Sequence, residues 1–145
     1  MKKNKIKFEK GFTLVELLTV IAIIGILASV VLVSMQGSVE KSKTASAITT
    51  LSSLLPELVT CADDNGIATS ATPGAGNIVC CNKSGCPTVQ SGHSVTWPAI
   101  LAKTGYDYAG TPSGSLALGT YTFTATKSGQ PTITCSYADN GCSTP

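Results

Sequence analysis

A lone acidic residue, Glu16, stands at the start of an uncharged apolar run that continues from Leu17 to Val33. At about 1.5 Å per residue, a helix over residues 12–33 is about 30 Å long, which is the thickness of one bilayer core. A charged side chain inside lipid is costly and persists where it has a partner. The nearest partner in the sequence is an α-amino group made by cleavage after Gly11, in the same chain or in another copy. The run therefore predicts a membrane-spanning helix whose first turn needs a counter-charge.

The positive charge of the chain is concentrated at its front. The formal net charge is +2, yet residues 1–11 hold five lysines and one glutamate, whereas residues 12–145 hold five lysines and seven acids. A basic flank before an apolar helix predicts that this end stays on the cytoplasmic side and that the rest is exported. The part beyond residue 62 is nearly neutral and has no arginine, so we expect no nucleic-acid partner.

The junction Lys10-Gly11-Phe12-Thr13-Leu14-Val15-Glu16, followed by the apolar run, resembles the class III leader of type IV prepilins and type II secretion pseudopilins. The resemblance covers roughly residues 1–55. It implies that a membrane peptidase cuts after Gly11 and N-methylates Phe12. An ordinary secretory signal peptide is the alternative, with an apolar core of ~7–15 residues and a small-x-small cleavage site. The run here is longer, and Glu16 lies within its beginning.

The helix that follows the leader should have two parts. Residues 12–34 form the transmembrane and assembly part, and residues 35–62 narrow to an amphipathic stripe with apolar residues three and four positions apart. Pro56 should kink or restart this helix, and Asp63-Asp64-Asn65-Gly66 should close it. We expect lipid contact or packing between copies from the apolar side chains Leu14, Leu17, Val20, Ile21, Ile24, Leu27 and Val31, and packing on the head from Ile48, Leu51, Leu55, Leu58 and Ala62.

All six cysteines lie beyond the apolar run, on the exported side: Cys61, Cys80, Cys81, Cys86, Cys135 and Cys142. An even number of cysteines in a short exported domain predicts disulfides. Zinc is the competing interpretation, but no C-x2-C spacing occurs and His93 is the only histidine. Sequence does not select one pairing. We favour Cys135–Cys142 and Cys81–Cys86 as short loops, with Cys61–Cys80 joining the helix end to the head.

The head over residues 63–145 shows one clear β signal. Thr120 to Lys127 and Thr132 to Tyr137 alternate between apolar and polar residues, and Ser128-Gly129 between them predicts a β-hairpin. Its apolar face should pack on the helical stripe. Pro98 to Lys103 is a possible short helix, with Trp97 as a core anchor. The expected fold class is α+β, a long N-terminal helix followed by a small head that contains a hairpin.

Other candidate sites are weak. Asp63-Asp64-Asn65-Gly66 lacks the ligands of a calcium loop and is better interpreted as a helix cap, and Asp139-Asn140-Gly141 is better interpreted as a turn. His93 lies in a Gly/Ser-rich stretch and should be solvated. We therefore expect no metal, no cofactor and no enzyme activity.

The resemblance implies a prepilin that is stored in the inner membrane, cleaved, N-methylated and polymerised, and we favour the structural subunit of a type IV pilus. Glu16 of an incoming subunit would pair with the amino group of Phe12, giving an open helical homo-oligomer. Expected partners are further copies, the prepilin peptidase, the inner-membrane assembly machinery and lipid. The alternatives are a type II secretion pseudopilin, a DNA-uptake minor pilin, and a membrane-anchored exported binding domain with an uncut leader.

Overall fold

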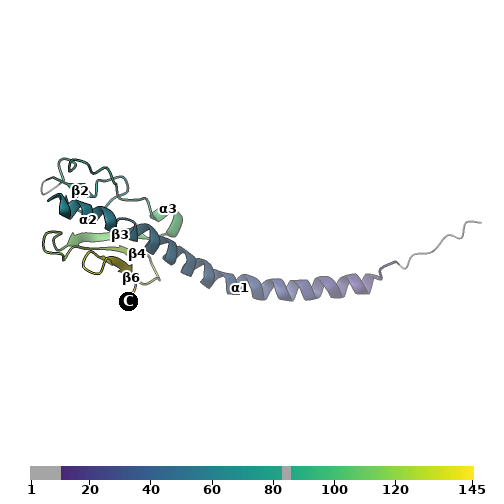
Figure 1. The fold of residues 1–145 in the computed structure, drawn as a ribbon. Coiled ribbons are helices and arrows are strands. Elements are labelled where there is room, and N and C mark those ends of the chain that lie inside the picture. Colours follow the sequence, from purple (N-terminus) through teal and green to yellow (C-terminus); the bar gives the residue numbers. More distant parts are fainter. Residues whose placement is uncertain (1–10, 83–85) are drawn as a thin grey trace, which may run out of the picture. The chain divides into compact units, whose positions relative to one another are not determined.

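The computed structural model describes residues 11–82 and 86–145 (Figure 1). The predicted leader, apart from Gly11, lies outside these residues. The expected α+β fold, with a long N-terminal helix followed by a small head with a hairpin, is confirmed. The chain divides into two compact units, one ending at Val39 and the other running from Glu40 to Pro145. In chain order the elements are α1 (Leu14–Ser52), α2 (Leu55–Asp63), β1 (Ile67–Ala68), β2 (Cys80–Cys81), α3 (Leu101–Thr104), β3 (Asp107–Ser113), β4 (Thr122–Thr126), β5 (Ile133–Ser136) and β6 (Gly141–Ser143).

The helical part breaks once, at the predicted proline. Helix α1 ends at Ser52, and α2 begins at Leu55 with Pro56 in its first turn. Proline has no N–H, and its ring clashes with the carbonyl four residues earlier, so a helix stops and restarts there. Helix α2 ends at Asp63, and Asn65 closes it with a positive φ of 55°. The expected cap is therefore present, and asparagine supplies its left-handed residue.

Four antiparallel strands form the main sheet, in the order β3-β4-β5-β6. The predicted hairpin is β4 and β5, with Phe123 opposite Cys135 and Ala125 opposite Ile133. Gly129 turns the chain between them with a φ of 72°. Strand β3 pairs with β4 across a register shift between Ala109 and Ser113. Strands β1 and β2 form a separate two-stranded sheet.

The core of the second unit lies between one face of the main sheet and the helical residues that precede it. Leu51 and Leu58 are fully buried there together with Phe123 and Ile133, so the predicted packing of the hairpin on the helical stripe is confirmed. Partly buried Ile48 and Ala62 extend the same stripe.

Trp97 anchors this core, as predicted. Its ring meets those of Tyr108 and Phe123 edge-on, with centroid distances of 5.3 and 4.9 Å. The helix expected from Pro98 begins instead at Leu101. The carbonyl of Pro98 accepts a hydrogen bond of 2.9 Å from the Tyr108 phenol, which fixes this residue outside the helix.

Candidate processing and assembly site

Helix α1 begins with a reciprocal cap between Thr13 and Glu16. The backbone N–H and the hydroxyl of Thr13 donate to Oε2 of Glu16 at 2.8 and 2.7 Å, and the Glu16 N–H donates to the Thr13 hydroxyl at 3.3 Å. This is a capping box, which satisfies N–H groups that the first turn of a helix otherwise leaves without partners. We did not predict it, although its signature of Thr or Ser followed three positions later by Glu was present in the sequence.

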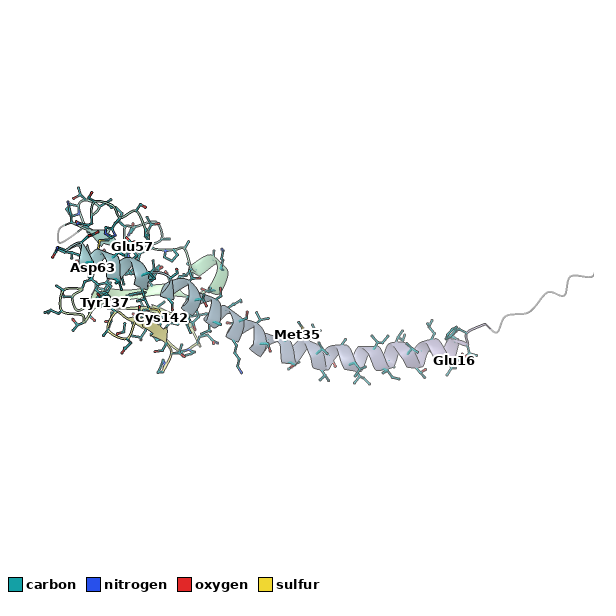
Figure 2. The ribbon with its side chains drawn as sticks, viewed as in Figure 1. Glu16, Met35, Glu57, Asp63, Tyr137 and Cys142 are labelled. Carbon is teal, nitrogen blue, oxygen red and sulfur yellow. A yellow bond between two sulfur atoms is a disulfide. The ribbon has the colours of Figure 1, made fainter. Side chains whose placement is uncertain are left out.

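The cap fixes where the Glu16 carboxylate lies. It folds back toward the N-terminal end of α1, where the helix dipole favours negative charge. Figure 2 labels Glu16 at this end of the helix. The carboxylate is exposed, and its recorded hydrogen bonds from the described residues use Oε2 alone. A positively charged donor can therefore approach the other oxygen while the cap stays formed.

The expected cleavage site lies just outside the helix. Gly11 and Phe12 precede the first helical residue, Leu14, and belong to no regular element. Phe12 is 87% exposed. A peptide bond outside regular structure is the kind that a peptidase can draw into an extended conformation. The Gly11–Phe12 bond thus lies four residues before the carboxylate that would accept the new amino group.

In the described part of the first unit, the large apolar side chains of α1 are uncovered. Helix α1 is long and apolar enough to cross a membrane by length and composition. Among the seven side chains expected to contact lipid or other copies, these are exposed by more than half: Leu17, Ile21, Ile24, Leu27 and Val31. Leu14 and Val20 are also exposed. Exposing such a surface to water is unfavourable, and burying it in lipid or against other apolar helices lowers the free energy.

The six cysteines form the three pairs that we favoured. Cys61–Cys80 joins α2 to β2, Cys81–Cys86 closes a short loop after β2, and Cys135–Cys142 joins β5 to β6. A sulfur held in a disulfide is neither a nucleophile nor a metal ligand. Among the residues that the structure describes, no three His, Cys, Asp or Glu side chains converge as a metal site.

The prediction that His93 is solvated is wrong. Its side chain is buried, and both ring nitrogens face carboxylates of the α2 segment. Those carboxylates belong to Glu57 and Asp64, which are seven positions apart and so lie on one face of the helical segment. A Gly/Ser-rich composition gave no sign of this, because the contacts cross 36 and 29 positions of sequence.

Comparison with known families identifies the N-terminal region only. The family described as the prokaryotic N-terminal methylation motif matches residues 6–32. The match includes Gly11, Phe12 and Glu16 and ends within α1. No solved structure matches the chain.

Proposed function

Because the chain carries the N-terminal methylation motif, the class III leader of type IV prepilins and pseudopilins, we propose that it is the structural subunit of a type IV pilus. The motif implies processing by a prepilin peptidase and assembly into filaments. In our proposal the peptidase cuts after Gly11 and methylates the amino group of Phe12. The role is structural and not enzymatic.

The observation that carries this proposal is the position of Glu16. Its carboxylate stands at the start of an apolar membrane-length segment, four residues after the new amino terminus. When helices pack in lipid, an acid in this position requires a positive partner. The amino group of Phe12 in a neighbouring subunit supplies that partner and sets the register between subunits. Leu14, Val20, Ile24, Leu27 and Val31 then supply the packing area.

The distribution of charge supports one topology. With five lysines before the apolar helix, residues 1–11 stay on the cytoplasmic side of the inner membrane until cleavage. Residues 12–34 then span the membrane, residues 35–62 continue toward the head, and residues 63–145 are the exported head. Three disulfides fit an oxidising compartment outside the cytoplasm.

The second candidate is a pseudopilin of a type II secretion system, because the same leader serves both classes. A cysteine-rich head without a carboxylate-rich C-terminal loop favours the pilus. Electron microscopy of material sheared from the cell surface separates the two: long surface filaments containing this chain support the pilus, and their absence from cells that carry the processed protein supports the pseudopilin.

Variants of the cap residues test the pairing role. Glu16→Gln keeps an acceptor for the capping box but removes the charge. Thr13→Ala keeps the charge and removes the two hydrogen bonds of the box that use the Thr13 hydroxyl, at a cost of about 1 kcal/mol. Thr19→Ala is the matched control, since this exposed threonine on the same helix bonds only a backbone carbonyl.

We expect all three variants to be cleaved after Gly11, as intact mass would show. Glu16→Gln should lower the yield of sheared filaments at least about tenfold. Thr13→Ala and Thr19→Ala should keep most of it. Cleaved Glu16→Gln protein that assembles at the normal yield would refute the pairing, and loss of cleavage in Glu16→Gln would assign the carboxylate to processing instead.

A further inference from the structure

The His93 ring is held between two carboxylates of one helical segment. Its Nδ1 lies 2.8 Å from Oε1 of Glu57, and its Nε2 lies 3.1 Å from Oδ2 of Asp64. The His93 side chain is 5% exposed and that of Glu57 is 13% exposed, while Asp64 is open to solvent. Glu57, labelled in Figure 2, belongs to α2, and Asp64 is the C-cap residue that follows the end of this helix at Asp63.

The two contacts together select one protonation state of the ring. An ionised carboxylate only accepts hydrogen bonds, so both ring nitrogens must carry a proton for both contacts to be hydrogen bonds. A neutral imidazole has one N–H and would present a lone pair to the other carboxylate. The geometry therefore fits the imidazolium, whose charge the two carboxylates balance.

The contacts of His93 with Glu57 and Asp64 attach the chain around His93 to α2, and Gln90 adds further hydrogen bonds. Gln90 donates from its side chain to the carbonyl of Asp64 at 2.9 Å and from its backbone to Cys80 at 3.2 Å. The His93 N–H donates back to Gln90 at 3.1 Å. Two isolated antiparallel β-bridges flank this segment: Val89 pairs with Cys81 of β2, and Thr96 pairs with Ile78. Between them, Gln90–Ser94, which we call the clasp segment, belongs to no strand or helix.

We propose that the contact of His93 with Glu57 and Asp64 is a proton-dependent clasp, which holds the clasp segment on α2 while the ring is charged and releases it when the ring loses a proton. This device lies in the exported head and is separate from the assembly role of Glu16. The two ring nitrogens of His93 face opposite ways, one toward Glu57 and the other toward Asp64. These groups therefore do not converge on one point that a metal ion could occupy.

The direction of the pH dependence follows from the charges around the ring. The hydrogen bond with Glu57 raises the pKa of His93, burial of the ring opposes this, and the bond with Asp64 adds to the rise. A group with a raised pKa in the closed state stabilises that state fully below its ordinary value of 6.5, and this contribution is lost as the pH rises through the raised pKa.

Two independent measurements on the mature full-length protein in detergent micelles together test the clasp. His93 is the only histidine, so its imidazole NMR signal gives its pKa without ambiguity, provided that no histidine tag is used. Amide hydrogen exchange of the clasp segment, corrected for intrinsic rates, gives its opening equilibrium at about pH 6 and about pH 9.

We expect a pKa above 6.5, and an opening equilibrium that rises about tenfold for each pH unit of that excess. Glu57→Gln should lower the pKa of His93, and His93→Gln should remove the pH dependence of exchange. Asp63→Asn is the matched control, an exposed neighbouring carboxylate that should leave both quantities unchanged.

A pKa at or below 6.5 in the wild-type protein would overturn the clasp. A raised pKa together with equal protection of the clasp segment at both pH values would also overturn it, because the charge would then hold nothing closed. The wild-type titration and the Glu57→Gln variant keep the test decisive if His93→Gln fails to fold.

Discussion

The ε-ammonium group of Lys127 donates to the carboxylate of Glu40, 87 positions earlier in the chain. The same ammonium group donates to the carbonyl of Thr104 at 3.0 Å. The Lys127 side chain is 16% exposed. A second cation, the ammonium group of Lys43, lies 3.1 Å from Oε1 of Glu40. Lys127 thus links the first residue of the second unit to the end of β4.

Replacing Lys127 by Met should lower the melting temperature of the head, because Glu40 loses its main cation and the Thr104 carbonyl loses a donor. Lys103→Met, at an exposed lysine of the same unit, should have little effect. Fluorescence of Trp97, the only tryptophan and a buried one, reports the unfolding. Equal melting temperatures for the two variants would contradict this link.

The same ion pair should show a defined pH dependence. Its bond with Lys127, and then that with Lys43, hold the pKa of Glu40 below its usual value of 4.5. A depressed pKa in the folded state gives stability that is present above pH 4.5 and is lost as the pH falls through the folded value. The difference in melting temperature between wild type and Lys127→Met should therefore shrink at about pH 3. A constant difference would show that the charge of Glu40 does not contribute.

Gly66 should not tolerate a side chain, because it faces the Cys61–Cys80 disulfide. A Cβ there would lie 2.6 Å from Sγ of Cys80 and 2.7 Å from Sγ of Cys61. Gly66→Ala should reduce the free energy of unfolding by about 1–3 kcal/mol, as overpacking typically does. Gly141→Ala is the matched control, since its Cβ would meet its nearest neighbour, the Asp139 carbonyl, at 3.6 Å. Denaturant unfolding without reductant measures both; similar losses would contradict the packing argument.

The three disulfides should differ in their effect on stability. Removing Cys61–Cys80, whose partners are 19 positions apart, should cost about 3 kcal/mol, because it closes the longest loop. Removing Cys81–Cys86, 5 positions apart, should cost about 2 kcal/mol. Paired Cys→Ser variants, compared by denaturant unfolding with the wild type, give both values. A larger loss from the Cys81–Cys86 variant would contradict this order.

The elements that sequence predicted are those with strong local signals. Pro56 can be accommodated only in the first turn of a helix, so it marks where the helix restarts, and the alternation around Phe123 and Ala125 fits one face of a strand. The partners of that strand were harder to find. Strand β3 contains Gly110 and Pro112 and is mostly exposed, so it shows no alternation, and it becomes a strand only by pairing with β4. Strand β6 has three residues, too few for any period.

The residues to which we assign proposed roles divide in the same way. Gly11, Phe12 and Glu16 were predicted because their spacing is local, and the Thr13–Glu16 cap could have been predicted for the same reason. His93 could not, since its environment depends on Glu57 and Asp64, which reach it only after α2 and the clasp segment have packed together. Long-range contacts of this kind leave no period in a single sequence.

The intact mass of the protein isolated from its native host, before and after reduction, tests the central claim most directly. Our account predicts a chain that starts at N-methylated Phe12 and gains six hydrogens on reduction, two for each of three disulfides. A mature protein that still carries residues 1–11 would contradict it, because the carboxylate of Glu16 would then have no amino group of Phe12 with which to pair.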